Sequence, residues 1–509
     1  MLAAAREVLE VFASRPDLGR HAKRLSDSGI AGTSLHFPFH WVTARWLAER
    51  WPAQLHVDWQ ALSGRERERF EQVLPLLLPY AEWPDPELGL SPRQWLERLK
   101  GPRETDATFL IRRFAALGVG PRERESLFHD LGKPLRLDAA PGSPSRSTAW
   151  LAGGEPVFQR RPLSRARPPV AQSVRRRLRS VEPLSRRDGQ QVIELARTSL
   201  ISRGRDLDGI MYASPDDVRL IDAGGGLSLA CLGLAPEHRA LVETLYVFLL
   251  LKNGVPVGYY QAALLFESAE VNYHVFTTFR GVETSEHYVR ALGVVHQLFG
   301  SNAFAVHPYQ LGHENRDALR AGAFWFYRKL GFAPENPRLL ATLRREERLA
   351  RRDPAYRSSP NALRRLASDY VFLYLGQPRD DIAGKLPLSA FSLAVSDFLA
   401  ARFGSDRERG LRVSARELAE LTDTRLADLS RTERLAWERL APLALALPGV
   451  GDWSRRELHA LAELVRAKGA VREEEFARQL DRHGRARRAL LELAANVTWP
   501  ARENARARR

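Results

Sequence analysis

The stretch Glu243–Phe279 reads ETLYVFLLLKNGVPVGYYQAALLFESAEVNYHVFTTF, and it contains the residues on which the fold prediction depends. In some places its apolar residues form short runs, and in others they alternate with polar residues with a period of two. Both patterns are typical of β-strands. Asn253-Gly254 lies between two of these runs, and a type I′ turn needs positive φ at both central residues, so the pair predicts a hairpin. In the last run Glu270, Asn272 and His274 share one face of the predicted strand.

The residues around this stretch extend it into a mixed domain. Two β-rich runs, VRLIDAGG and SLACLGL, precede it. After it we expect a helix over about 284–298, a strand AFAVHPYQ, a helix over about 316–330 and, after an insertion, a strand DYVFLYLG at 369–376. Hairpins that lead into a central helix predict the α+β class.

Helical spacing of apolar residues predicts α-helical domains on both sides. We expect a helical N-terminal domain over 1–139, a Pro/Arg-rich basic linker over 140–195, the α+β domain with its insertion over 196–376, and a helical C-terminal domain over 377–509.

Two segments of the central part carry recognisable motifs. GAFWFYRKLGF, Gly322–Phe332, resembles the motif of the GCN5-related N-acetyltransferase (GNAT) superfamily in which a helix carrying a Tyr runs into Lys-Leu-Gly-Phe. AEVNYHVFTTFRG, Ala269–Gly281, resembles the family's fourth strand and the turn that follows it. The resemblance covers roughly residues 205–335, and it implies a GNAT-like mixed sheet with helices.

The resemblance also implies a site. Two strands, here 269–277 and 303–309, would splay apart around the pantetheine of an acyl-coenzyme A. Tyr327 would protonate the departing thiolate as a general acid. The residues implied for the cosubstrate are Val275, Phe276 and Thr277 beside the pantetheine, and Arg280, Gly281, Thr284 and Ser285 around the pyrophosphate.

One position departs from the family's phosphate loop, which reads Gln/Arg-x-x-Gly-x-Gly/Ala. Here Arg280 matches the first position, but Glu283 replaces a glycine and Ser285 stands at the sixth. A carboxylate is itself a favoured ligand of a helix N-terminus. We therefore expect the Glu283 side chain to fill the anion site.

Candidate bases lie on or beside the two splayed strands. They are Glu270, His274, His307 and Tyr309, and each could equally be a solvent-facing residue of a half-buried strand. Among the candidate catalytic residues we rank Tyr327 first, although it could also be a core aromatic, and His307 second.

The charge of the chain has two interpretations. The 77 Lys and Arg exceed the 61 Asp and Glu by 16, and only seven of the cations are Lys. Arg spread over solvated helix faces explains much of this excess. Between Arg160 and Arg187, however, ten Arg accompany one acid, Glu182. This segment is either a solvated linker or an arm that binds nucleic acid.

Other features of the sequence limit the class of protein. Cys231 is the one cysteine, no Cys/His spacing resembles a zinc site, and we expect no metal cofactor. Charges interrupt the N-terminal apolar pattern, and no run of eighteen uncharged apolar residues occurs. We expect a cytoplasmic protein without a membrane partner.

The sequence thus predicts an acyltransferase that moves an acyl group from acyl-coenzyme A, or from another carrier, to the amine of a small molecule or protein. Alternatives are a GNAT-like fold that uses an aminoacyl-tRNA, a nucleic-acid-binding protein, and a non-catalytic scaffold.

Overall fold

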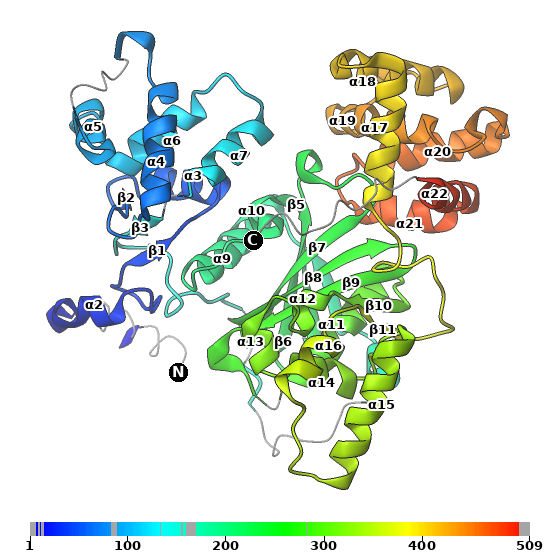
Figure 1. Cartoon of the computed structure of the whole chain (residues 1–509), viewed down its shortest axis with the longest axis horizontal. Coiled ribbons are helices and arrows are strands. Elements are labelled where there is room, and N and C mark those ends of the chain that lie inside the picture. Colours follow the sequence, from blue (N-terminus) through cyan, green and yellow to red (C-terminus); the bar gives the residue numbers. More distant parts are fainter. Residues whose placement is uncertain are drawn as a thin grey trace. The chain divides into compact units, whose positions relative to one another are not determined.

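The computed structural model describes residues 15–82, 89–132, 134–153, 156–158, 169–281 and 283–497, together with Glu7, Val8 and Val11. The chain divides into two compact units (Figure 1): unit 1 comprises residues 1–153 and 190–212, and unit 2 comprises residues 154–189 and 213–509. A large mixed sheet is preceded and followed by helices, which confirms the predicted α+β class. The predicted boundaries at 139, 195 and 376 are finer than this division and stay predictions.

Unit 1 packs short helices around a three-stranded antiparallel sheet in the order β1-β3-β2. Its elements are β1 (Leu35–Phe37), β2 (Leu55–Val57), β3 (Leu135–Leu137), α2 (Ala22–Leu25), α3 (Trp41–Arg50), α4 (Gly64–Val73), α5 (Pro92–Leu99), α6 (Asp106–Ala115), α7 (Pro121–Asp130) and α10 (Asp208–Met211). It also includes α9 (Arg186–Ile201) from Gln190 onward. The sequence predicts only helices here, because a three-residue strand is too short to show alternation.

Unit 2 is built on an eight-stranded sheet in the order β11-β10-β9-β8-β7-β6-β5-β4. The strands are β4 (Ser180–Pro183), β5 (Ala213–Gly224), β6 (Leu227–Leu234), β7 (Thr244–Lys252), β8 (Val255–Leu265), β9 (Ser268–Val275), β10 (Ala303–Val306) and β11 (Val371–Tyr374). Neighbouring strands are antiparallel except β9 and β10, which are parallel and are joined through α11 (Thr284–Phe299). Asn253 and Gly254 have φ of 49° and 79°, which confirms the predicted hairpin between β7 and β8.

The main core of unit 2 lies between one face of this sheet and α11. Phe248, Tyr260 and Val271 of the sheet belong to the same buried cluster as Leu292 of α11. On β9 the alternation leaves Glu270, Asn272 and His274 half-buried while their neighbours are buried, as predicted.

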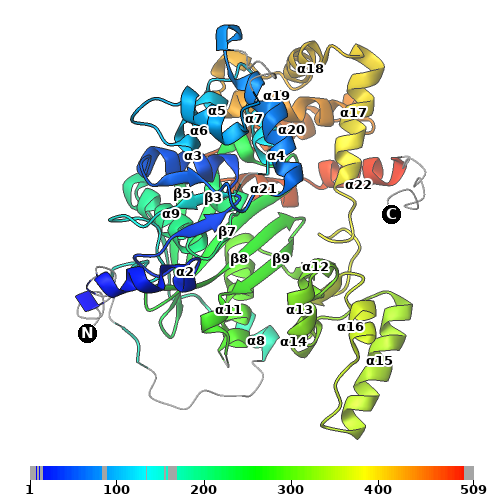
Figure 2. The same ribbon diagram turned by 60° about the vertical axis from the view of Figure 1, so that its left-hand side comes forward.

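The other helices of the central part are short, apart from one. They are α8 (Val170–Val174), which packs against α11, and α12 (Pro308–Leu311), α13 (Arg316–Arg320), α14 (Ala323–Lys329), α15 (Pro337–Arg352) and α16 (Pro360–Leu366). Figure 2 shows α15 and α16 side by side in the insertion between β10 and β11. β11 pairs with β10, so the predicted late strand is confirmed.

Two predicted elements differ from the structure. The strand over AFAVHPYQ ends at Val306, because Pro308 lacks an N–H for the ladder and occupies the first turn of α12 instead. The helix over 316–330 is two helices, because Gly322 has a φ of 65° and turns the chain between α13 and α14.

The C-terminal part of unit 2 is helical, as predicted. Its helices are α17 (Ser389–Phe403), α18 (Arg407–Leu421), α19 (Arg431–Leu445), α20 (Arg455–Ala467), α21 (Glu474–Arg482) and α22 (Gly484–Asn496). They enclose a second core around Trp437, and this core also takes in Val242, Leu265 and Phe266 from the ends of sheet strands.

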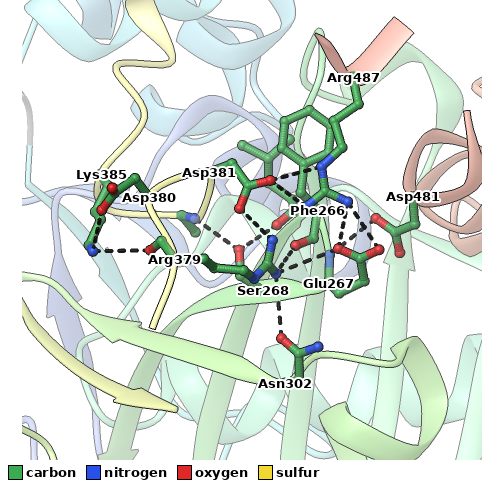
Figure 3. A network of polar contacts seen from close by, with 12 residues as sticks. Phe266, Glu267, Ser268, Asn302, Arg379, Asp380, Asp381, Lys385, Asp481 and Arg487 are labelled. Atoms are coloured by element: carbon green, nitrogen blue, oxygen red, sulfur yellow. Dashed lines mark hydrogen bonds and ion pairs between the residues drawn. The ribbon is translucent and has the colours of Figure 1, made fainter. Parts of the chain in front are cut away.

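A network of charged side chains joins these helices to the turn between β8 and β9 (Figure 3). Arg487 of α22 lies over the Phe266 ring, 4.7 Å from its centroid, and donates to Glu267 and Asp381. Asp481 of α21 accepts the Glu267 N–H at 3.1 Å. The network thereby fixes Glu267, the turn residue directly before β9 and three residues before Glu270.

Candidate active site

Strands β9 and β10 pair only where they begin. Their parallel register joins Ser268 to Ala303 and Glu270 to Ala305. β10 then ends at Val306, whereas β9 continues to Val275. In the described part of the chain, the second half of β9 therefore has no strand partner on its β10 side, because β10 ends where α12 begins. The predicted splaying of the two strands stays a prediction.

A cavity of about 1230 Å³ lies at the beginning of α11. Gly281, Thr284 and Ser285 line it from the loop and the first turn of that helix, and further residues come from α14 and from the segment 347–358. The first amides of a helix lack partners within the helix, and its N-terminus carries partial positive charge. This end of the cavity therefore favours an anion.

Cationic side chains dominate the charge of the cavity lining. Arg328, Lys329, Arg351 and Arg357 line it together with one carboxylate, Glu347. Arg328 donates to Glu347 at 2.8 Å, which balances that carboxylate and leaves a positive excess. Guanidinium and ammonium groups beside a helix N-terminus suit a phosphorylated ligand.

The expectation for Glu283 is wrong. Its Oε1 atom lies 2.8 Å from Nζ of Lys252, the last residue of β7, and its side chain makes no capping hydrogen bond to α11. Burial opposes ionisation of this carboxyl, but Lys252 lowers its pKa below the usual value. The nearby lysine therefore holds Glu283, which leaves the N-terminus of α11 without a side-chain cap.

The residues predicted to contact the cosubstrate fall into two groups. Gly281, Thr284 and Ser285 line the cavity, whereas Val275, Phe276, Thr277 and Arg280 do not. The Phe276 amide donates to the Val257 carbonyl at 2.9 Å. That amide is therefore already bonded within the sheet.

Tyr327, the predicted general acid, lies in the core of unit 2. Its side chain is 3% exposed, and its ring meets the Tyr288 ring edge to face with centroids 5.6 Å apart. Burial raises the pKa of its phenol above the ordinary value of 10. A phenol in this position keeps its proton at neutral pH, as a general acid must.

Glu270, a predicted base, belongs to a cluster of four titratable groups. The Tyr370 hydroxyl of the segment before β11 donates to Glu270 Oε2 at 3.1 Å, and His307 packs edge to face against the Tyr370 ring at 5.2 Å. Burial raises the pKa of Glu270. Burial, and next the charge of Glu270, raises the pKa of Glu243 to about 6.

His307, the other predicted base, is engaged at one nitrogen. Its Nδ1 atom accepts the N–H of Tyr309 at 3.1 Å and caps α12. In the neutral ring the proton is then on Nε2, so neither nitrogen is a free acceptor. Glu270 is therefore better placed than His307 to accept a proton.

The remaining two candidates are less suited to this role. His274 stacks on Tyr259 of the neighbouring strand with ring centroids 5.2 Å apart. Tyr309 is 50% exposed in α12. Neither belongs to the cluster around Glu270.

Several residues of the site could not be found from the sequence. Glu243 stands one residue before β7, Tyr370 is 100 positions from Glu270, and Arg351 and Arg357 come from the insertion. Arg328 and Lys329, by contrast, lie inside the motif Gly322–Phe332 that the sequence singled out.

The basic segment Arg160–Arg187 is partly structured. Arg160, Arg161, Arg165 and Arg167 lie outside the described residues, whereas α8, β4 and the first turn of α9 occupy much of the rest. The side chains that follow α8 are exposed, namely those of Arg175, Arg176, Arg177 and Arg179.

Among the described residues, no group of three His, Cys, Asp or Glu side chains could hold a metal ion. Within the same residues, no helix combines the length and the apolar composition needed to cross a membrane.

No family model, curated protein or solved structure matches this chain.

Proposed function

We propose that unit 2 is an N-acyltransferase of the GNAT type, which moves an acyl group from acyl-coenzyme A to an amine. The observation that carries this proposal is the cationic cavity at the N-terminus of α11, the helix that joins the parallel strands β9 and β10. Its volume of about 1230 Å³ is ample for a nucleotide-sized cosubstrate. The GNAT resemblance implies the phosphates of the cosubstrate at this position.

The residues around β9 and β10 supply two proton transfers. Glu270 accepts a proton from the acceptor amine, and the Tyr370 hydroxyl orients its carboxylate. Tyr327 gives its proton to the departing sulfur of the thioester. Gly281, Thr284 and Ser285 hold the phosphates together with Lys329 and the two arginines of the insertion, Arg351 and Arg357.

The cavity predicts how substitutions change the affinity for acetyl-coenzyme A. Lys329→Ala and Arg351→Ala should each weaken binding by about tenfold, because each removes a charge-assisted contact to phosphate. Arg348→Ala is the matched control, since Arg348 is exposed on α15 but does not line the cavity. Isothermal titration of the full chain gives the dissociation constants.

Two results would contradict the proposal. One is no detectable heat with the wild-type chain at millimolar acetyl-coenzyme A. The other is an equal loss of affinity in Arg348→Ala, which would indicate general attraction by a basic surface.

The exposed arginines after α8 support a second candidate, a nucleic-acid partner. Arg175 donates to the Leu375 carbonyl and Arg179 lies 4.0 Å from Asp222, so Arg176 and Arg177 are the best placed to reach phosphates. The affinity for a labelled single-stranded RNA should fall as the salt concentration rises. The double substitution Arg176→Ser with Arg177→Ser should make the plot of log affinity against log salt concentration less steep, by about one to two in the slope.

The matched control is Arg344→Ser with Arg345→Ser on α15, both exposed. A salt-independent affinity, or the same slope in both double variants, would exclude this surface. RNA binding without acetyl-coenzyme A binding would favour the aminoacyl-tRNA alternative, and binding of neither would favour the scaffold.

A further inference from the structure

Four tyrosines from four different elements surround one point of the unit 2 core. They are Tyr260 of β8, Tyr273 of β9, Tyr288 of α11 and Tyr327 of α14. The Tyr288 ring is 4.9 Å from Tyr273, 5.6 Å from Tyr327 and 6.1 Å from Tyr260, measured between centroids. Each of the four side chains is at most 9% exposed.

Two of the four hydroxyls have no hydrogen-bond partner among the described residues. The Tyr273 hydroxyl donates to the Thr284 carbonyl at 3.1 Å. By contrast, the hydroxyls of Tyr260 and Tyr288 are fully buried and unpartnered. Burying a hydroxyl without a partner is unfavourable, and phenylalanine would fill almost the same space without that loss.

The electrostatic neighbours of these hydroxyls indicate what they face. Burial is the main cause that raises the pKa of Tyr260 and Tyr288, and for both the next cause is the Tyr327 phenol. The ring contacts agree with this: Tyr288 lies directly against Tyr327, and Tyr260 lies against Tyr288.

A buried general acid needs such neighbours. Burial makes the Tyr327 phenolate costly, and an ordinary tyrosine is already a weaker acid than a thiol, with pKa values of about 10 and 8.5. Proton transfer from Tyr327 to sulfur is therefore unfavourable unless donors stabilise the phenolate. Catalytic hydrogen bonds that are long in the free protein commonly shorten in the substrate complex.

We propose that Tyr260 and Tyr288 are positioning residues that donate hydrogen bonds to the Tyr327 oxygen as it gives up its proton. This inference rests on the proposed function. The N–C bond to the acceptor forms as the C–S bond of the thioester breaks, the sulfur takes the Tyr327 proton, and Glu270 takes the proton of the amine. After the products leave, Glu270 releases its proton to solvent and Tyr327 regains one from solvent, so protons balance and nothing is oxidised or reduced.

The first arm of the test measures stability. Tyr260→Phe and Tyr288→Phe are expected to leave the midpoint of chemical denaturation unchanged or to raise it. Tyr246→Phe is the matched control, because Tyr246 is equally buried but its hydroxyl donates to Asp217 at 2.8 Å and accepts the Glu474 N–H at 3.0 Å. This control should lower the midpoint.

The second arm measures thiol release from acetyl-coenzyme A with butylamine as acceptor. Tyr260→Phe and Tyr288→Phe should lower kcat about tenfold or more with little change in KM, since each removes a hydrogen bond to an ionised oxygen. With S-(4-nitrophenyl) thioacetate, whose thiol is far more acidic and needs no proton donor, the deficit should shrink. A purely structural role would lower both rates alike.

The outcomes separate the two proposals. No thiol release by the wild-type chain would overturn the acyltransferase proposal and, with it, this inference. A wild type that is active, with Phe variants that are as unstable as Tyr246→Phe or that keep full kcat, would overturn this inference alone.

Discussion

Glu270→Gln is expected to lower the rate of acetyl transfer from acetyl-coenzyme A to butylamine by about 10²- to 10⁴-fold, the range that a general base contributes. Glutamine keeps the size of the side chain and can still accept the Tyr370 hydroxyl, so the fold around β9 should persist. Affinity for acetyl-coenzyme A should stay unchanged, because Glu270 does not line the cavity at α11. Thiol release and isothermal titration measure the two quantities separately.

The pH dependence of kcat/KM tests the same role through Glu243. A base works only when ionised, and burial raises the pKa of Glu270, so the rate should fall as the pH drops through that raised value. Burial is the main cause that raises the pKa of Glu243 to about 6, and repulsion by the Glu270 charge adds to it. Repulsion between two carboxylates is mutual, so the charge of Glu243 should also disfavour ionisation of Glu270. Glu243→Gln removes this negative charge, lowers the pKa of Glu270 and should move the acidic limb of the profile to lower pH.

Glu420→Gln is the control for both measurements, since Glu420 is exposed on α18 in the C-terminal helices. A Glu270→Gln variant that retains wild-type kcat would remove Glu270 from the mechanism. An acidic limb that stays in place in Glu243→Gln would show that the two carboxylates are not coupled in solution.

Local signals explain the parts of this fold that the sequence predicted. Asn253-Gly254 determines a turn by its own backbone preferences, and the alternation of Glu270 and His274 with apolar residues determines which face of β9 they occupy. The backbone signals of Gly322 and His307-Pro308 are equally local. The surrounding apolar pattern nevertheless predicts one helix that continues through Gly322 and one strand that continues through His307-Pro308. In both places the backbone preference of a single residue outweighed the surrounding pattern.

Which residues meet at the site depends on contacts between segments that are distant in sequence. No local sequence pattern contains this information. Glu283 was expected at the α11 amides, but Lys252 lies within reach only because the end of β7 comes beside α11 in the fold. Tyr370 reaches Glu270 because β11 pairs with β10 after an insertion of more than sixty residues between β10 and β11. Side chains that are distant in sequence thus decided which candidate base is best placed.

Arg239→Met is expected to destabilise the junction between the sheet and the C-terminal helices by about 3–5 kcal/mol, the cost of leaving a buried charge uncompensated. Arg239 is 6% exposed and donates to the carbonyls of Leu234, Lys468, Ala470 and Val471 at 2.6–3.2 Å. It thereby joins the end of β6 to the turn between α20 and α21.

Methionine fills a similar volume but provides none of these donors. The substitution also removes a cation beside Glu473, whose side chain is fully buried. Among the described residues, Lys468 is then the one close cationic partner that Glu473 retains. Several carbonyls and one carboxylate would then lose compensation together. Arg239→Lys restores the charge but not the planar fork that reaches several carbonyls, so it should recover only part of the loss.

Amide hydrogen exchange in the helix core around Trp437 and Trp453 follows this junction during chemical denaturation, because both side chains are buried there. Arg402→Met is the matched control: Arg402 makes two hydrogen bonds to Glu417, but both side chains are more than a third exposed. Breaking such a surface pair costs about 0–1 kcal/mol. Equal shifts in the two variants would show that solvent reaches Arg239 and that the buried network does not hold the helices to the sheet.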